Sequence, residues 1–348
     1  MSQPLNIAVL FGGCSPEYGV SLQSAAAVLR HMDRMKYKPV MAGISQDGDW
    51  FHYTGPVSRL ENDSWCCAEA CAPAALSPSR SHPGLLVREG RTIRRIPLDA
   101  AFPILHGRNG EDGTVQGLIE LADIPLVGCG VLSSALCMDK DRAHKLVREA
   151  GIDVPESFTV RRTDGGILER AEALGYPLFV KPVRAGSSFG ITRVTEKSAL
   201  PAALEAAFAY DGEAILETVI SGFEVGCAVL GKDTLTVGEP DEIELHGDFF
   251  DYTEKYTLKT SAIHVPARVT PEQRLQIQEN AKSIYRALDC RGFARVDQFL
   301  TPEGRLVFNE VNTIPGFTAH SRYPSMMKAA GLSFEQVISA LIELAVKP

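Results

Sequence analysis

In residues 1–130, short apolar runs alternate with amphipathic stretches. The run Asn6–Phe11 ends at two glycines, and a helical pattern begins near Val20. Three further apolar runs have the length of buried strands: Pro39–Ile44, Ala100–Leu105 and Pro125–Gly128. Residues 58–97 are rich in Ser, Pro, Ala and Cys, which predicts an elaborated loop or hairpin region. The alternation of strand and helix predicts a doubly wound, parallel-sheet domain.

The pattern changes after residue 130. The charged stretch Asp139–Ala150, stopped by Gly151, predicts a helix, and the strands Leu178–Lys181 and Ile191–Val194 are joined by a Gly- and Ser-rich turn. From about residue 222 the runs are typical of antiparallel strands: Glu224–Leu230, Thr234–Ile243, Phe293–Leu300 and Arg305–Val311. Helical patterns accompany them at Pro271–Leu288 and Phe334–Val346. We therefore expect three α/β lobes, with limits at residues 1–130, 131–221 and 222–348.

The composition is that of an ordinary globular protein, with 45% hydrophobic and 22% charged residues in a chain of 348. The formal net charge of −8 and the scattered basic residues argue against nucleic acid as a partner. The opening MSQPLNIAVLFGG lacks a charged n-region, and its apolar run is too short for a signal peptide or a membrane span. Eight cysteines without a zinc-type spacing suit reduced thiols. We therefore expect a cytoplasmic protein with no membrane partner.

A hairpin near the C-terminus places oxygen ligands together. Its two strands flank the turn signal TPEG. Because side chains two residues apart in a strand share a face, the hairpin can display Asp297, Glu310 and Asn312 on one side. Two carboxylates and an amide oxygen are ligands that Mg²⁺ takes, above all when phosphate oxygens complete its shell. A solvated acidic face is the alternative. The rigid sequel TIPG leads to a helix start that can hold a carboxylate, which favours the metal site.

The segment LFVKPVRAGSSFGI suits a phosphate group. A strand ends at Lys181 and a loop of small residues follows, so backbone N–H groups and an ammonium can approach phosphate oxygens. It is neither a GK[ST] loop nor a GxGxxG turn, and a plain hairpin turn is the alternative. Glu217 ends a strand and can accept from an adenine amino group, although a solvated strand end is the commoner case. Glu17 follows the Gly12-Gly13 strand exit, where a parallel sheet forms its ligand crevice.

Eight motifs occur in one order across nearly the whole chain: GGCSPEYGVS, LHGRNGEDGTVQG, MDKDRAHK, VKPVRAGSSFG, DYTEKY, ARVDQF, NEVNTIPGFT and HSRYP. In this order and spacing they resemble the D-alanine–D-alanine ligase family of ATP-grasp enzymes. The resemblance implies an ATP-grasp fold, in which an N-terminal doubly wound domain precedes two ATP-grasp lobes. It also implies an ATP-dependent ligase that joins two D-amino acids through an acylphosphate.

The resemblance further implies which residues bind ATP and metal. ATP would be contacted by Lys140, Lys181, Ser188, Glu217, Glu224 and Lys255. The lysines and the loop Gly186–Gly190 would hold phosphates, and the glutamates would contact adenosine. Two Mg²⁺ ions, with Mn²⁺ as the alternative, would be held by Asp297, Glu310 and Asn312.

The two amino acids would meet a second group of residues. Glu17 would bind the ammonium of the first D-amino acid, and Arg295 with the amide of Gly316 would stabilise the tetrahedral oxyanion. Four further residues would orient these groups: Ser187 and Tyr256 beside the second amine, with His106 and Glu111 as positional residues. The stretch DYTEKYTLKTS would be a lid that excludes water.

Two positions depart from the housekeeping members of the family. Arg322, which follows Ser321 in HSRYP, stands where an apolar residue is usual, and Phe250 replaces a Tyr. An Arg can bond a hydroxyl that a methyl pocket would not need, and the intact Lys255-Tyr256 pair suits an amine rather than lactate. The nearest resemblance is therefore to D-alanine–D-serine ligases of the vancomycin-resistance type, which implies a homodimer that serves peptidoglycan synthesis. D-Alanine–D-alanine ligase is the alternative.

Three other classes fit less well. A nicotinamide dehydrogenase should carry GxGxxG where this chain has GGCSPE. A non-catalytic ATP-binding protein should lack a metal ligand or Arg295. An ATP-grasp ligase that acts on a larger acid stays open. The sequence offers no reason for Tyr18 and Gly19, which stand where the family often has His or Arg and then a polar residue.

Overall fold

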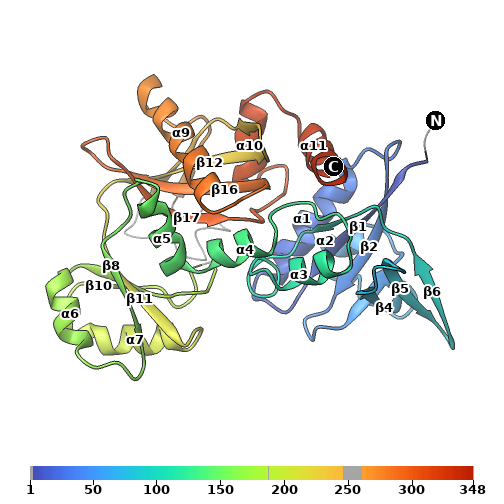
Figure 1. Cartoon of the computed structure of the whole chain (residues 1–348), viewed down its shortest axis with the longest axis horizontal. Coiled ribbons are helices and arrows are strands. Elements are labelled where there is room, and N and C mark those ends of the chain that lie inside the picture. Colours follow the sequence, from blue (N-terminus) through green and yellow to red (C-terminus); the bar gives the residue numbers. More distant parts are fainter. Residues whose placement is uncertain (1–2, 187, 246–260, 348) are drawn as a thin grey trace.

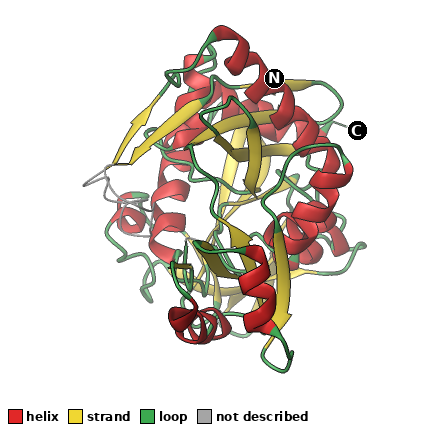
Figure 2. Cartoon of the chain, turned by 90° about the vertical axis from the view of Figure 1, so that its left-hand side faces the viewer, coloured by secondary structure: helices red, strands yellow, loops and turns green. Residues whose placement is uncertain are grey.

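The computed structural model describes residues 3–186, 188–245 and 261–347. It is a mixed α/β structure with three sheets, formed in sequence order along the chain (Figure 1). Seen from the side, helices flank the strands in each part of the molecule (Figure 2). Within the described ranges no single helix is long and apolar enough to cross a membrane, and only two helices near the C-terminus, bent by 101°, reach that length and composition as a pair.

The first sheet has seven strands in the order β6-β5-β4-β3-β2-β1-β7. Its strands are β1 (Leu5–Gly12), β2 (Tyr37–Ile44), β3 (Trp50–Tyr53), β4 (Cys71–Ser77), β5 (Gly84–Glu89), β6 (Thr92–Ile96) and β7 (Ala100–Pro103). The helices of this part are α1 (Tyr18–His31), α2 (Ser58–Glu61) and α3 (Thr114–Leu121). Only β2, β1 and β7 pair in parallel, and β3 to β6 extend the sheet as antiparallel hairpins. The predicted loop or hairpin region 58–97 therefore consists of α2 and three strands.

From Ile7 onward strand β1 is apolar and buried, because both faces of the sheet are covered there. Ile7, Val9 and Phe11 pack with α1 and with α11 (Phe334–Val346), whereas Ala8 and Leu10 pack with α3. Helix α11, drawn in red, therefore returns to the blue N-terminal part and lies beside α1 (Figure 1). The predicted strand Pro125–Gly128 contributes only an isolated bridge between Leu126 and Ala101.

The second sheet is antiparallel and has the order β10-β9-β11-β8. Its strands are β8 (Ser157–Arg161), β9 (Leu178–Pro182), β10 (Thr192–Val194) and β11 (Glu213–Thr218), and its helices are α6 (Ile167–Leu174), the 3₁₀ turn η1 (Lys197–Ala199) and α7 (Leu200–Phe208). Helices α4 (Val131–Met138) and α5 (Lys140–Glu149) precede it. Asp139 separates the two, because its side chain caps α5 by accepting from the amide of Arg142.

The third sheet has the order β15-β14-β12-β16-β17, with β13 paired to β12. Its strands are β12 (Phe223–Gly231), β13 (Leu235–Val237), β14 (Asp241–Leu245), β15 (Ser261–His264), β16 (Gly292–Leu300) and β17 (Leu306–Asn312). Helices α9 (Pro271–Ala287) and α10 (Arg322–Ala329) accompany α11 here. The single predicted strand Thr234–Ile243 is two strands, because Pro240 lies between β13 and β14 and cannot donate a ladder hydrogen bond.

Helix α5 belongs in packing to the third sheet rather than to the second. Its buried residues Ala143 and Val147 lie in the same apolar cluster as Ile277 of α9 and Val296 of β16. The first residue of α5, Lys140, is thereby fixed at the junction of the second and third sheets. The exact lobe limits at residues 130 and 221 stay a prediction.

Candidate active site

Four strands bring an acidic row onto the third sheet. Asp241 of β14 lies opposite Gly226 of β12, Gly226 lies opposite Asp297 of β16, and Asp297 lies opposite Glu310 of β17. A Cβ on Gly226 would lie 2.5 Å from the Nη2 atom of Arg322 and 2.6 Å from Oδ1 of Asp241. The sheet therefore needs glycine at this position so that the Arg322 side chain can lie over it between two aspartates.

The guanidinium of Arg322 is buried against three carboxylates. Its Nε and Nη2 donate to the two oxygens of Asp241 over 2.7 and 2.8 Å, and Nη1 donates to Glu224 Oε1 over 2.7 Å. Nη2 also lies 3.4 Å from Asp297 Oδ1. Burial opposes the positive charge, yet Asp241 and Asp297 hold the pKa of Arg322 well above its ordinary value. Arg322 is therefore a fixed cation within the acidic row, between Asp241 and Asp297.

Arg295 is the second cation of the row. Its Nε donates to Asp297 Oδ1 over 2.8 Å, and its Nη2 donates to Oδ2 over 2.7 Å. Although burial disfavours the charge, Asp297 raises the pKa of Arg295 above its ordinary value. The amide of Asn312 donates to the same carboxylate over 3.0 Å. The hairpin thus brings Arg295, Asp297 and Asn312 together on one face, as the strand parity predicted.

The donor set fits a divalent cation. When ionised, the four carboxylates of Glu224, Asp241, Asp297 and Glu310 face two guanidinium groups, which leaves a charge of −2 (four negative, two positive). All the oxygens are hard ligands of the kind that Mg²⁺ prefers. In the described part of the chain no group of three His, Cys, Asp or Glu side chains has metal-binding geometry. An ion here would therefore depend on Asn312 and on substrate oxygens to complete its shell.

A cavity of about 490 Å³ opens between the second and third sheets. Six of the predicted residues line it: Lys140, Lys181, Ser188, Glu217, Glu224 and Glu310. Its volume lies in the range of small-molecule sites, roughly 300–1,000 Å³. The described phosphate-binding candidates and one metal-binding candidate, Glu310, therefore line a single cavity.

Glu217 is buried, and only one of its two carboxylate oxygens has a hydrogen-bond partner among the described residues. Its Oε2 lies 2.6 Å from the ammonium of Lys181. Its Oε1 has no hydrogen-bond partner among the described residues and lies 3.9 Å from His144 Nε2. Burial alone would raise the pKa of Glu217, but Lys181 and His144 hold it below the ordinary value. A charged acceptor with an unpartnered buried oxygen suits a ligand that brings an N–H donor, such as an adenine amino group.

The turn after β9 is hydrogen-bonded to Lys140. The ammonium of Lys140 donates to the carbonyl of Ala185 over 2.7 Å. Ser188, further along the turn, has a positive φ of 58°. A left-handed residue in a Gly-rich turn directs backbone N–H groups to one side, which suits a phosphate.

Glu17 lies at the carboxyl end of β1, where the parallel strands β2, β1 and β7 leave a crevice. It immediately precedes α1 and is 8% exposed. A Cβ on Gly107 would lie 2.6 Å from Glu17 Oε2, and one on Gly186 would lie 3.1 Å from it. The Glu17 carboxylate therefore lies between the turn after β7 and the turn after β9.

His106 connects this crevice to the loop after β17. Its Nδ1 lies 2.9 Å from the carbonyl of Ile314, which can only accept, so Nδ1 carries the proton. Burial lowers the pKa of His106, so the ring is neutral and Nε2 accepts from Ser24 Oγ at 3.4 Å. Ser24 in turn accepts from the amide of Phe317 over 3.2 Å. The loop that contains Gly316 is thereby fixed to α1.

Ser321 holds the far end of the same loop. Its hydroxyl accepts from the amide of Thr318 over 3.0 Å, and a Cβ on Gly316 would lie 3.2 Å from it. The side chain of Ser321 therefore shapes the loop that leads into α10 and Arg322.

Glu111 makes a second connection between the two parts. Its Oε2 accepts from the amide of Gly107 over 2.8 Å, and its Oε1 accepts from the amide of Ile314 over 3.1 Å. Burial and the nearby charge of Glu17 raise the pKa of the Glu111 carboxyl to about 8, although both amides favour the charged form. Glu111 therefore links the turn after β7 to the loop after β17, and its positional role stays a prediction.

The raised pKa of Glu111 predicts a pH-dependent stability. Unfolding returns this carboxyl towards its ordinary pKa of 4.5, so the native protein holds a proton that the unfolded chain releases between the two values. This stabilisation is complete below the ordinary pKa and is lost as pH rises through about 8. We expect Tm, measured by calorimetry, to fall more between about pH 6 and about pH 9 in the wild type than in Glu111→Gln. An exposed control, Glu303→Gln, should keep the wild-type slope. An equally steep fall in Glu111→Gln would contradict the assignment.

Four predicted residues lie outside the described residues: Ser187, Phe250, Lys255 and Tyr256. Most of the predicted lid lies there as well. Asp241 is a site residue that sequence reasoning missed. The local alternation indicates only that Asp241 faces inward, since it lies two residues before the buried Ile243.

The structure gives a reason for a tyrosine at position 18. Its hydroxyl donates to Asp63 Oδ1 over 3.0 Å and accepts from Trp65 Nε1 over 2.8 Å. The first residue of α1, next to Glu17, is thereby fixed to the loop after α2. For Gly19, beside which an added Cβ would meet open space, nothing in the structure gives a reason.

The chain is similar to known proteins over nearly its whole length. Family models described as D-ala D-ala ligase N-terminus and C-terminus match residues 6–129 and 146–343. The crystal structure of the VanG D-Ala:D-Ser ligase from Enterococcus faecalis is similar, with a TM-score of 0.93 and 57% identity over 99% of this chain and 100% of that one. The vancomycin B-type resistance protein VanB of Enterococcus faecalis is 47% identical over 99% of each chain. A putative D-alanine–D-lactate ligase of Streptomyces coelicolor is 47% identical over 98% of this chain and 97% of its own.

Proposed function

The chain belongs to the D-alanine–D-alanine ligase family, and we propose that this ATP-dependent ligase, with its three-lobed ATP-grasp fold, joins D-alanine to D-serine. The product would enter peptidoglycan precursors and give vancomycin resistance. A cytoplasmic homodimer is part of the proposal and rests on the family resemblance alone.

Arg322 is the residue that supports D-serine as the second substrate. Three of the five N–H groups of its guanidinium hydrogen-bond to Asp241 and Glu224, and Nη2 also lies 3.4 Å from Asp297 Oδ1. Among the described residues Nη1 bonds only to Glu224, so its second N–H suits a hydroxyl, whereas a second methyl group would leave that donor unsatisfied. The 57% identity to a ligase described as D-Ala:D-Ser supports the same choice.

ATP would occupy the cavity between the second and third sheets. Lys140 and Lys181 would contact its phosphates, and Ser188 would present backbone N–H groups to them. The unpartnered Oε1 of Glu217 would accept from the adenine amino group. Glu224, which also lines the cavity, would contact the ribose while it holds Arg322.

Asp297, Glu310 and Asn312 would hold two Mg²⁺ ions, or Mn²⁺ in their place. Such ions offset the negative charge of the phosphates. The guanidinium groups of Arg295 and Arg322 lie 2.7 and 3.4 Å from the Asp297 carboxylate and hold it in place on the sheet.

The chain's own groups account for the remaining chemistry. Glu17 would bind the ammonium of D-alanine, so that the substrate carboxylate attacks the γ-phosphate, and ADP leaves with its bridging oxygen. The amine of D-serine then attacks the acylphosphate carbonyl and loses a proton, and inorganic phosphate departs. Arg295 and the Gly316 amide would donate to the tetrahedral oxyanion between these two events.

The residues outside the described ranges keep their proposed roles. Ser187 and Tyr256 would orient the second amine beside Glu17, and Lys255 would contact the transferred phosphate. Phe250 would border the pocket of the second substrate.

The alternative function is that of a housekeeping D-alanine–D-alanine ligase. The same ATP site and the same Glu17 would serve it, so only the second-substrate pocket separates the two functions. Arg322 separates the two proposed functions, because its N–H groups can donate to the hydroxyl of D-serine but not to the methyl group of D-alanine.

Replacing Arg322 should reverse the substrate preference. In Arg322→Leu, the ratio of kcat/KM for D-serine to kcat/KM for D-alanine should fall by about tenfold or more, since a site built to bond a hydroxyl loses that bond. Initial rates of ADP release with each second substrate measure the ratio. Because the variant leaves Asp241 and Glu224 without their cation, absolute activity will fall as well, and the ratio is therefore the informative quantity.

Arg268→Leu is the matched control. Arg268 forms a bidentate pair with Glu242, the neighbour of Asp241 in β14, but hydrogen-bonds to neither Asp241 nor Glu224. Its ratio should equal that of the wild type. An unchanged ratio in Arg322→Leu would remove Arg322 from the selection of the second substrate.

A further inference from the structure

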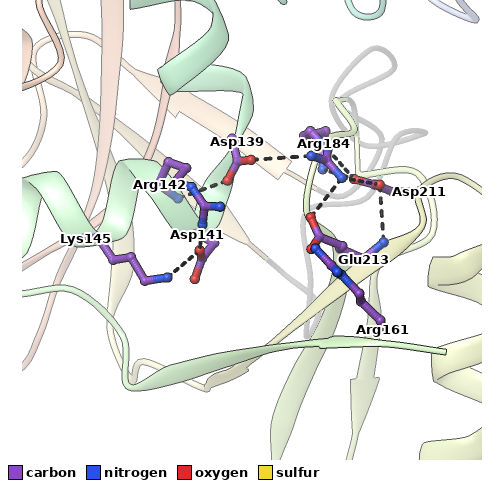
Figure 3. Close-up of polar contacts among 8 residues, drawn as sticks. All are labelled: Asp139, Asp141, Arg142, Lys145, Arg161, Arg184, Asp211 and Glu213. Atoms are coloured by element: carbon purple, nitrogen blue, oxygen red, sulfur yellow. Dashed lines mark hydrogen bonds and ion pairs between the residues drawn. The ribbon is translucent and has the colours of Figure 1, made fainter. Parts of the chain in front are cut away.

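Arg184 lies in the turn after β9, four residues before Ser188, and is surrounded by three carboxylates (Figure 3). Its Nε and Nη2 donate to the two oxygens of Asp211 over 3.0 and 2.8 Å. Its backbone N–H donates to the same carboxylate over 2.8 Å. Asp211 lies between α7 and β11. The pairing is therefore bidentate, and it also fixes the main chain at residue 184.

The same guanidinium reaches two other elements. Nη2 donates to Glu213 Oε2, at the start of β11, over 3.0 Å. Nη1 lies 3.8 Å from Asp139 Oδ2, and the other oxygen of Asp139 caps α5. Arg184 thus joins the second sheet to the helix that begins with Lys140 (Figure 3).

Lys140 bonds the chain on both sides of Arg184. Its backbone N–H donates to the carbonyl of Val183 over 3.2 Å, and its ammonium donates to the carbonyl of Ala185 over 2.7 Å. The beginning of the turn and the first residue of α5 are therefore held as one unit.

Geometry and burial separate this network from an ordinary surface ion pair. An isolated exposed ion pair contributes little to stability, and the Arg184 side chain is 45% exposed. Its main partner is different, because the Asp211 side chain is 8% exposed. Burial would raise the pKa of Asp211, but the hydrogen bonds from Arg184 hold it below the ordinary value. The buried carboxylate therefore needs Arg184.

We propose that Arg184 is a positioning residue for ATP, which sets the ammonium of Lys140 and the turn before Ser188 in one fixed arrangement around the phosphates. The inference rests on the proposed nucleotide role of Lys140 and Ser188. It does not depend on which amino acid is the second substrate.

The test measures KM for ATP in Arg184→Met, with D-alanine as both amino acids. We expect KM for ATP to rise about tenfold while kcat at saturating ATP stays within about twofold, since bound nucleotide at saturation can still hold the Lys140 ammonium at its phosphates. Arg184→Lys keeps the charge but cannot pair bidentately, so its KM should also rise, by about threefold or more. Tm of each variant shows whether the fold is kept.

Arg161→Met is the matched control. Arg161 donates to Glu213 Oε1 over 2.9 Å, on the side of Glu213 away from Arg184, and does not contact Asp211 (Figure 3). Its KM for ATP should equal that of the wild type.

Three results would overturn the inference. KM for ATP could be unchanged in Arg184→Met, or it could rise equally in Arg161→Met. A fall in kcat and Tm without a change in KM would assign Arg184 a purely structural role. Failure of the proposed function would give a different result. The wild-type protein itself would then release no ADP with D-alanine.

Discussion

Asp297→Asn should reduce the rate of ATP-dependent ligation by a factor of about 10³ or more while the fold is kept. Asp297 is 1% exposed and is contacted by Arg295, Arg322 and Asn312. The substitution keeps the shape of the side chain but removes the one charge that both guanidinium groups share. It also removes an anionic ligand from the proposed Mg²⁺ site, so the variant should need more Mg²⁺ for half-maximal rate.

ADP release over a range of Mg²⁺ concentrations, together with Tm, measures this effect. The control is Glu303→Gln, an exposed carboxylate in the turn of the same hairpin, which should keep its rate within about twofold. Near-normal turnover of Asp297→Asn at ordinary Mg²⁺ would remove Asp297 from the metal site.

Arg295 should show the second largest effect. In Arg295→Lys, kcat should fall by about 10²–10³, which is the usual loss when one donor to an oxyanion is removed. A lysine preserves the positive charge beside Asp297, so Tm should change little, but it cannot reproduce the bidentate geometry. KM for ATP should stay close to that of the wild type, because Arg295 does not line the nucleotide cavity.

Steady-state kinetics with saturating amino acids separates these quantities. Arg305→Lys is the control, since Arg305 lies at the other end of the same hairpin and pairs only loosely with Asp153 at 3.3 Å. Retention of the wild-type kcat in Arg295→Lys would show that another group stabilises the oxyanion.

The parts of the site that could be predicted from the sequence depend on local periodicity. Asp297, Glu310 and Asn312 meet because a hairpin brings two strands together with a known parity. The turn after Lys181 was visible because small residues interrupt an apolar strand. The resemblance to a known family then added residues such as Glu17, which have no local signal of their own.

The site residues that could not be predicted from the sequence depend on which strands pair in the sheet. Asp241 is a site residue only because β14 pairs with β12, which places it beside Gly226, and no local pattern predicts that pairing. The partners of Arg322 follow from the same pairing. Helix α4 was missed because its residues, VLSSALCM, are too apolar to show an amphipathic stripe.

Small errors in the strands have a similar origin. Thr234–Ile243 read as one strand because its apolar residues alternate across Gly238 and Pro240. The apolar run at residues 125–128 is buried only at Val127 and Gly128, and it forms a single bridge at the edge of the first sheet. In both segments the apolar residues are explained by partial burial, although the backbone does not form a continuous ladder of hydrogen bonds with a neighbouring strand.

The most direct test of the proposed function is the partition of product when the wild-type enzyme chooses its second substrate. The enzyme would receive Mg²⁺-ATP, D-alanine, D-serine and D-lactate at equal concentrations, and mass spectrometry would identify the products. D-Alanyl-D-serine should be the main product, with about one ADP released per molecule formed. D-Alanyl-D-alanine or D-alanyl-D-lactate as the main product would contradict the assignment of Arg322 as the group that selects a hydroxyl-bearing amino acid.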